Sequence, residues 1–389
     1  MSAGAPARVS DMSGLMLGAA GMFAAMYSSQ AILPELASDF DVTPSQAGLT
    51  ISVVVLAVAV AGWIWGPLSD RFGRRRSLML ASGLLVLPSL GAAVAPTFTT
   101  LLVLRAMQGA CMPGLLTVGI PYVAEVYAPG LGGRAMGYYT IALVGGGVVG
   151  RVGVGLVTSV AGWRIAFALV ALLPLAGVIL MRRRLPEAPV PERSGGRRIA
   201  LTQFANPAVL VPAITACAFF FAFVGVFSYA SFRLQGPRFG FGPAATSLVF
   251  SLWALGAIGP SAGRLADRFG WRRVALSGVV LAASGMALTL PASPATMLPG
   301  LAVLTLGMFT GVTAAQLGLA AAGPSDRGVA SAIYFSFYYG AGALAGFIPG
   351  LGWEEWGWRG VIAITAPALA VGAAALHWAR GRVPAWTSS

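Results

Sequence analysis

Long apolar runs, separated by short clusters of charge, proline and glycine, dominate this sequence. Each run is long enough to cross the ~30 Å core of a bilayer as a helix, at about 1.5 Å rise per residue. They cover residues 13–34, 46–68, 77–95, 100–124, 135–160, 165–181, 208–232, 246–265, 274–290, 295–319, 328–349 and 360–376. None shows the ~10-residue alternation of membrane β-strands. The pattern predicts an all-α membrane protein of twelve transmembrane helices.

Composition supports this prediction. Apolar residues make up 57% of the chain and charged residues only 10%, against about 25% charged in soluble domains. Little is left for loops, so an extramembrane domain of any size is excluded. The first run is longer than the 7–15-residue core of a signal peptide, and we expect it to be an uncleaved span.

All 25 basic residues are arginine, and with 12 acids they give a net charge of +13. In a soluble protein this charge would suggest a nucleic-acid partner, but in a membrane protein arginines collect in cytoplasmic loops. With the N-terminus inside, nineteen arginines fall in cytoplasmic segments. The predicted outer loops hold four, which are Arg164, Arg233, Arg238 and Arg359. We therefore expect a multi-pass protein of a bacterial cytoplasmic (inner) membrane with both termini in the cytoplasm, and no nucleic-acid partner.

The chain divides into two similar halves. The segment 66–76, GPLSDRFGRRR, recurs at 263–273 as GRLADRFGWRR, and the Gly-Trp-Arg of 162–164 recurs at 357–359. Between the halves lies a stretch rich in proline, glycine and arginine, which is typical of a linker. We predict an N-terminal six-helix bundle (1–181), a cytoplasmic linker (182–207) and a C-terminal six-helix bundle (208–389). Since six spans is an even number, both copies have the same orientation.

The GxLxDRxGRR pattern after the second run resembles the signature loop of the major facilitator superfamily, and the resemblance covers all twelve runs. It implies a secondary transporter that moves a small molecule by alternating access. Gly66 would let two helices approach closely, Gly73 would permit a tight turn, and Asp70 would accept hydrogen bonds from arginines. The implied conformational latch comprises Gly66, Asp70, Arg71, Gly73 and Arg74 and, in the second copy, Gly263, Asp267, Arg268 and Gly270.

The fourth run contains LLVLRAMQG at 101–109, which is similar to a second motif of this superfamily. Its arginine lies inside the membrane, and in the family it is associated with proton coupling in exporters. A buried guanidinium is costly, so an intramembrane arginine indicates function. The resemblance therefore implies a coupling or substrate role for Arg105 and Gln108, with a structural ion pair as the alternative.

The fifth run reads GGGVVGRVGVG at 145–155, where antiporters of the superfamily carry a glycine-rich element with Gly-Pro. Arg151 stands in place of that proline, as in a branch of bacterial efflux permeases that the run resembles. The glycines predict a surface for close helix packing. The packing residues are Gly146, Gly150 and Gly155.

Polar residues near the outer end of the first run, Tyr27 and Gln30 among them, predict a polar pocket around the two intramembrane arginines. No acid lies in the interior of any run, since Glu35 and Glu125 stand at run ends. The arginines therefore need a substrate anion or backbone carbonyls as partners. Because arginine stays protonated, proton coupling would require Glu35 or Glu125.

The second half is rich in aromatic residues. The family's architecture places spans one, four, seven and ten around the transport cavity, and packing is the alternative role for aromatic stripes. The candidate cavity-lining residues are Phe223, Phe227, Gln316, Tyr334 and Tyr338.

Other chemistry is poorly supported by the sequence. Cys111, Cys217 and the single His377 are too few for a disulfide framework or a metal cluster. No GxxxxGK[ST] loop is present, and the chain has no lysine to complete one. We therefore expect no cofactor, no enzymatic activity, a monomer, and energy from a proton gradient or the substrate's own gradient.

Three functions follow from these observations. The first is a proton-coupled exporter of drugs or metabolites, which the motifs imply by resemblance. The second is a transporter of a small or organic anion bound by Arg105 and Arg151. The third is a membrane sensor or scaffold that does not transport.

Overall fold

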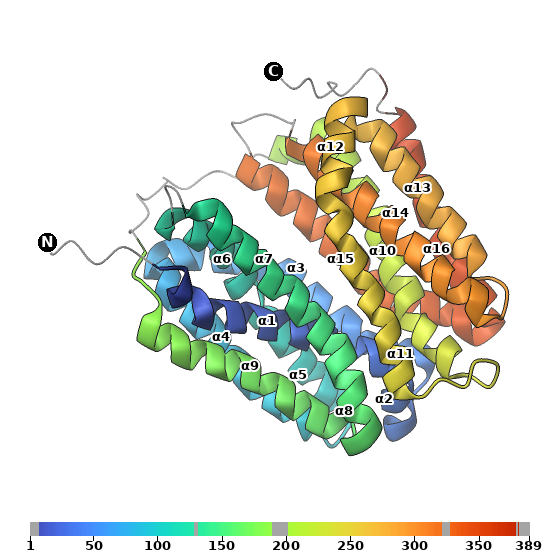
Figure 1. Cartoon of the computed structure of the whole chain (residues 1–389), viewed down its shortest axis with the longest axis horizontal. Coiled ribbons are helices and arrows are strands. Elements are labelled where there is room, and N and C mark those ends of the chain that lie inside the picture. The colour runs from blue at the N-terminus through green and yellow to red at the C-terminus, as the bar shows by residue number, and fades with distance from the viewer. Residues whose placement is uncertain (1–7, 128–130, 189–200, 321–326, 379, 381–389) are drawn as a thin grey trace, which may run out of the picture. The chain divides into compact units, whose positions relative to one another are not determined.

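The computed structural model describes residues 8–127, 131–188, 201–320, 327–378 and 380, and all regular structure within them is helical (Figure 1). Within the described residues, eleven helical stretches are long and apolar enough to cross a membrane. The predicted ninth span is also a helix, α13 (Trp271–Leu288). It opens with Arg272 and Arg273 directly after Trp271, which lowers its mean hydropathy. The predicted all-α fold of apolar helices is confirmed.

Helix contacts divide the chain into two units, of which the first comprises residues 1–32 and 60–197. In this unit α1 packs against α7 and α9, and α4 packs against α5, α6 and α9. Its helices are α1 (Ser13–Tyr27), α4 (Arg74–Ala93), α5 (Phe98–Cys111), α6 (Pro113–Val126), α7 (Gly132–Val148), α8 (Val154–Ala161) and α9 (Trp163–Arg184). Helix α3 (Pro44–Phe72) belongs to both units.

The second unit comprises residues 33–59 and 198–389. Here α10 is central, with contacts to α14, α15 and α16, and α13 lies along α14. The helices are α2 (Leu33–Phe40), α10 (Pro207–Gln235), α11 (Pro243–Val249), α12 (Gly259–Phe269), α13, α14 (Pro294–Ala320), α15 (Arg327–Trp356) and α16 (Trp358–Trp378). The predicted linker lies between α9 and α10, and residues 189–200 of it are outside the described part of the chain.

Several predicted spans are single in sequence but broken in structure. The first is interrupted at Ser28 and Ser29, where α1 gives way to a short 3-10 turn (Gln30–Ile32) before α2. The fourth breaks between α5 and α6 at Met112, because Pro113 has no N–H for the helix ladder. The fifth contains a π-helical turn (Val149–Gly153) between α7 and α8. These breaks interrupt the regular α-helical hydrogen bonds inside the membrane, where protein groups must satisfy the backbone atoms that are left over.

Residues 33–59 pack on helices from the second half of the sequence, which is why they belong to the second unit. A Cβ added at Gly48 on α3 would collide with the carbonyl of Gly346 on α15, so the two backbones are in direct contact. The hydroxyl of Tyr229 on α10 donates to that carbonyl at 2.6 Å. At the start of α3, the amide of Ser45 donates to Oε1 of Glu354 at 2.9 Å. We name this contact between residues 33–59 and α10 and α15 the seal.

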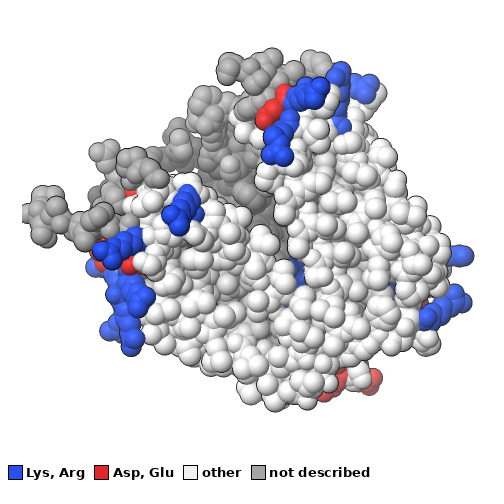
Figure 2. Space-filling model, in the orientation of Figure 1, with Lys and Arg blue, Asp and Glu red and all other residues white. Residues whose placement is uncertain are grey.

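Charged side chains gather at the helix ends, whereas the broad flanks visible in Figure 2 carry few. Many large apolar side chains of the described residues are exposed, such as Leu87 at 72% and Val160 at 85%. Such a surface suits contact with lipid chains and is unusual in water-soluble monomers.

Candidate functional site

Arg105 on α5 is fully buried and holds the broken end of the first span. Its Nη1 donates to the carbonyl of Ala25 at 2.5 Å, and its Nη2 to the carbonyl of Met26 at 2.9 Å. The hydroxyls of Ser28 and Ser29 accept further hydrogen bonds at 3.2 Å. A helix end leaves its last carbonyls without intrahelical partners, and here the guanidinium supplies them. Of the two predicted partners, backbone carbonyls are the ones found.

Gln108, one turn after Arg105, extends this network to a third helix. Its Oε1 accepts from Nη1 of Arg105 at 2.9 Å, and its Nε2 donates to the hydroxyl of Ser89 on α4 at 2.9 Å. The amide is 3% exposed. Both polar ends of Gln108 are thus satisfied, which a buried amide requires.

Arg151 lies on the π-helical turn and contacts the same broken segment from the other side. Its Nε donates to Oε1 of Gln30 at 2.8 Å, and its Nη1 to the carbonyl of Gly147 at 2.9 Å. Its guanidinium carbon lies 3.7 Å from the ring centroid of Tyr27, a close cation–π contact. Arg105 and Arg151 therefore both contact residues 25–30 at the end of the first span, and the pocket around them stays a prediction.

The glycines of the fifth span bring Arg151 into this position. A Cβ on Gly146 or Gly150 would collide with backbone atoms of Ala20 or Ala24 on α1, so these helices touch through their backbones. Gly155 is buried on α8. Close approach of small residues is the usual packing mode of membrane helices, and here it sets the distance across which Arg151 reaches α1.

The signature motif lies mostly on helix, not in a loop. Asp70 ends α3 within its last turn, and the turn to α4 consists of Gly73 alone, at φ +89°. Nη1 of Arg74 lies 3.7 Å from Oδ1 of Asp70, and its Nε pairs with Oε2 of Glu125 at 2.5 Å. Nη1 also donates to the hydroxyl of Ser69 at 3.4 Å. The structure thus places Glu125 beside Asp70 and Arg74, away from Arg105.

Gly66 has a different environment from the one expected. No atom of its own unit lies within 4 Å of a Cβ built on it, so the helices of that unit do not approach one another there. Arg71 lies over the neighbouring ring of Phe72, with 5.6 Å from its guanidinium carbon to the centroid. Neither residue takes part in the ion pairs of the latch in this structure.

The second copy of the motif keeps the turn and loses the pairing. Gly270 has φ +86° and begins the turn to α13, as Gly73 does for α4. The position of Arg74 is taken by Trp271, which is 1% exposed and packs in the core. Within the described residues Asp267 forms no ion pair, and Arg268 lies over the ring of Phe269. Gly263, like Gly66, has open space within its unit.

The aromatic candidates are packed against other rings. Phe223 and Phe227 on α10 are fully buried. The ring of Phe223 is tilted against Trp253 at a centroid distance of 4.6 Å, and that of Phe227 meets it edge-on at 6.0 Å. Tyr334 is also fully buried and stacks on Tyr338. In this structure Phe223, Phe227 and Tyr334 thus contact neighbouring rings, and their cavity-lining role stays a prediction. Gln316 on α14 is exposed.

Glu35 contacts a residue that the sequence offered no means of choosing. Its Oε1 accepts from Nε2 of Gln235 at the end of α10, at 2.9 Å, and this hydrogen bond belongs to the seal. Its Oε2 is buried and has no hydrogen-bond partner among the described residues. The two residues are 200 positions apart, and no short-range pattern links them.

Known proteins resemble the chain over most of its length. The sequence model of the Major Facilitator Superfamily matches residues 15–346 and, in a second match, 238–388. The MFS-type transporter YybF of Bacillus subtilis is 30% identical over 87% of this chain and 86% of its own. The inner membrane transport protein YnfM of Escherichia coli is 28% identical over 92% and 88%.

Solved structures share the fold. A bacterial homologue of the human lysosomal transporter Spinster, in an inward-facing and occupied conformation, superposes with a TM-score of 0.81 at 17% identity, over 97% of this chain and 98% of that one. The xylose transporter XylE from E. coli, in its inward-open conformation, gives 0.75 at 18% identity, over 98% of both chains. By sequence and by fold, the chain is a multi-pass membrane protein that belongs to the major facilitator superfamily of transporters.

Proposed function

We propose that this protein is a proton-coupled exporter of small molecules, working by alternating access in the bacterial cytoplasmic membrane. Membership of a transporter family and the duplicated six-span sequence support the transport cycle. The relative from the E. coli inner membrane supports the location. A monomer with protons as coupling ion and both termini in the cytoplasm completes the proposal.

The surroundings of Glu35 are the observation that supports proton coupling. A carboxylate needs cations or hydrogen-bond donors to remain charged when it is shielded from water. Glu35 accepts hydrogen bonds from Gln235 and from its own backbone amide, has one buried oxygen without a partner, and forms no ion pair among the described residues. It is therefore a group that can take up and release a proton during a cycle.

The position of Glu35 connects protonation to movement. Its hydrogen bond with Gln235 is part of the seal, together with the contacts of Gly48 and Ser45. By the arginine distribution, the seal lies at the outer ends of the helices. When it opens, Glu35 loses Gln235 and meets outside water, from which it can bind a proton.

Glu125, the other carboxylate considered for proton coupling, has different surroundings. It pairs with Arg74 at 2.5 Å, and its side chain is 34% exposed. Glu125 thus has a cationic partner, which Glu35 lacks among the described residues. We therefore assign Glu125 to the latch and not to proton transfer.

The contacts of the two intramembrane arginines favour this proposal over anion transport. Arg105 donates to two carbonyls, two hydroxyls and an amide, and Arg151 donates to Gln30 and Gly147. A substrate anion would have to displace these partners. We propose that both arginines maintain the broken first span, which must survive the change of conformation.

Transport in proteoliposomes tests the proposal. Ethidium and tetraphenylphosphonium serve as lipophilic cation probes, with benzoate and phosphate as anion probes, and a pH gradient is imposed in each direction. We expect proton-driven movement of a cation probe in the wild type and in Glu125→Gln. In Glu35→Gln we expect transport driven by a pH gradient to fall to background. Exchange of the probe across the membrane should continue when the pH is the same on both sides.

Two outcomes would contradict the proposal. Unchanged pH-driven transport in Glu35→Gln would remove this residue from coupling. Gradient-driven movement of the anion probes alone, lost in Arg151→Ala, would instead support the anion transporter.

A further inference from the structure

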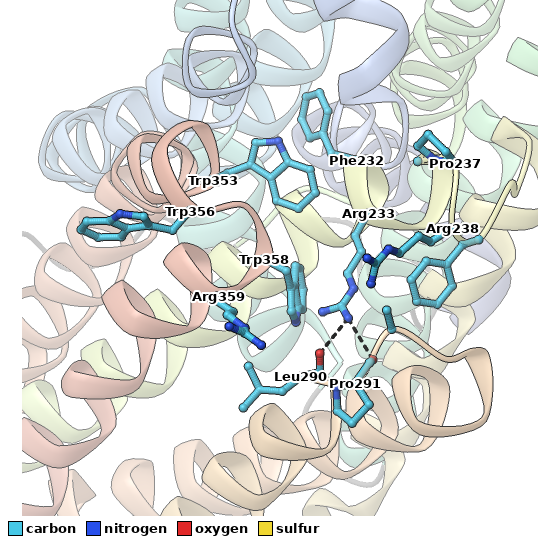
Figure 3. A pocket seen from close by; sticks show the side chains of 13 residues that line it. Phe232, Arg233, Pro237, Arg238, Leu290, Pro291, Trp353, Trp356, Trp358 and Arg359 are labelled. Atoms are coloured by element: carbon cyan, nitrogen blue, oxygen red, sulfur yellow. Dashed lines mark hydrogen bonds between the residues drawn. The ribbon is translucent and has the colours of Figure 1, made fainter.

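A cavity of about 740 Å³ lies at one end of the second unit, where α10, the α13–α14 turn, α15 and α16 meet (Figure 3). Three arginines line it, Arg233, Arg238 and Arg359, and tryptophan rings form much of its wall. No carboxylate is among its lining residues. The cavity is therefore cationic and aromatic.

Arg233 is the fixed element of this cavity. It is 8% exposed, and its Nη2 donates to the carbonyls of Leu290 and Pro291 at 3.0 and 2.9 Å (Figure 3). Its guanidinium carbon lies 4.8 Å from the ring centroid of Trp358. Its Nη1 is buried and has no hydrogen-bond partner among the described residues. A buried donor without an acceptor is costly, and a ligand oxygen would satisfy it.

The sequence makes this gathering of charge unusual. The arginine distribution places only four arginines on the outer side, and Arg233, Arg238 and Arg359 are three of them. The fourth, Arg164, belongs to the other unit, where it occupies the repeat position of Arg359. Arginines that depart from the positive-inside distribution and converge on one cavity indicate a bound anion.

The walls indicate an amphiphile. Trp353, Trp356 and Trp358 line the cavity, and Trp356 is 67% exposed. Tryptophan collects at the level of lipid headgroups, where one side of the ring is apolar and the other is wet. Guanidinium groups bind phosphate through paired hydrogen bonds. A phosphate attached to an apolar body fits both features.

We propose that this cavity binds the phosphate of an anionic phospholipid headgroup from the outer leaflet. Nη1 of Arg233 donates to a phosphate oxygen, Arg238 and Arg359 supply further charge, and the tryptophan rings contact the glycerol and the first methylenes. The site is separate from the proposed transport function and uses none of the residues assigned to it.

Native mass spectrometry of the full-length protein tests this proposal, with phosphatidylglycerol, phosphatidylcholine and soluble glycerol 3-phosphate as probes. The test variant is Arg238→Gln/Arg359→Gln, because both side chains are exposed and substitution leaves the contacts of Arg233 in place. The matched control is Arg164→Gln, at the repeat position in the other half.

We expect phosphatidylglycerol adducts on the wild type at concentrations where phosphatidylcholine gives few. In the double variant the apparent Kd should rise about tenfold, from the loss of two charge-assisted contacts, and in Arg164→Gln it should stay unchanged. Equal binding of both lipids, or an equal loss in Arg164→Gln, would overturn the site. Saturation by glycerol 3-phosphate at the affinity of phosphatidylglycerol would overturn the lipid as its occupant.

Discussion

Nη1 of Arg105 donates a 2.5 Å hydrogen bond to the carbonyl oxygen of Ala25, which lies 80 positions earlier in the chain. Where α1 ends, the hydroxyl of Ser28 also donates to that carbonyl, at 2.9 Å, so the arginine and the serine satisfy it together. The arginine thus takes over the role of the missing helical turn. An arginine that the motif associates with coupling here also has a structural role.

Replacing Arg105 should therefore destabilise the fold. Arg105→Ala removes the guanidinium donor from the carbonyls of Ala25 and Met26, of which Ala25 keeps the hydroxyl of Ser28 at 2.9 Å. Losing hydrogen bonds to a charged group should cost about 1.5–3 kcal/mol. Arg105→Lys should restore only part of this, since one ammonium group cannot reproduce the fork. Thermal unfolding in detergent measures both, with Arg164→Ala as the control at an exposed arginine. An unfolding temperature equal to wild type in Arg105→Ala would refute the structural role.

The contact between α1 and the π-helical turn after α7 gives a second prediction. Gly150→Ala places a methyl group against the backbone of Ala24 and should cost about 1–3 kcal/mol through overpacking. Gly145→Ala, five residues earlier, has open space within its unit and should be neutral or slightly stabilising. The same unfolding assay compares the two variants. Equal stabilities would mean that the helices can separate at no cost.

The glycine turns in the two copies of the signature motif give a third prediction. Gly73 and Gly270 have φ near +88°, where side chains with a Cβ are strained. We expect Gly73→Ala and Gly270→Ala each to lower stability by about 1–2 kcal/mol. Gly66 lies in regular helix, so Gly66→Ala should change the stability little. A loss in Gly66→Ala as large as in Gly73→Ala would show that the conformation of the turn is not what matters.

Substitutions in the latch should affect the rate of transport more than the stability of the fold. The pair of Asp70 and Arg74 is at the surface, where ion pairs contribute about 0–1 kcal/mol. Asp70→Ala should therefore unfold near the wild-type temperature while transport slows. Asp267→Ala, in the copy without an ion pair among the described residues, should slow it less. Transport at the wild-type rate in Asp70→Ala would leave the latch without support and favour the sensor or scaffold.

The helices were predictable from the sequence because length and hydropathy decide what crosses a bilayer. The break at Met112 also has a local signal in Pro113, whereas the break at Ser28 has none. That break is stabilised by Arg105, for which the sequence offered backbone carbonyls as one kind of partner without indicating which carbonyls they are. Phe223 shows the opposite limit, because an aromatic stripe looks the same whether it lines a cavity or packs against Trp253.

Distant pairings were beyond sequence reasoning. Glu35 and Gln235 are joined by the fold alone, and each is unremarkable among its neighbours in sequence. The cavity around Arg233 is assembled from four separate segments, and only the shared outer position of its arginines was visible beforehand.

Because of the seal, the linker is not the sole connection between the two halves of the sequence. Residues 33–59 precede the linker in the chain yet pack on α10 and α15, through Gly48 with Gly346 and Ser45 with Glu354. Two polypeptides made by interrupting the gene between α9 and α10 should therefore find each other and purify together. The linker would then be needed for membrane insertion of the two halves and not for their association. The protein would behave as an obligate complex of two subunits that are encoded in one reading frame.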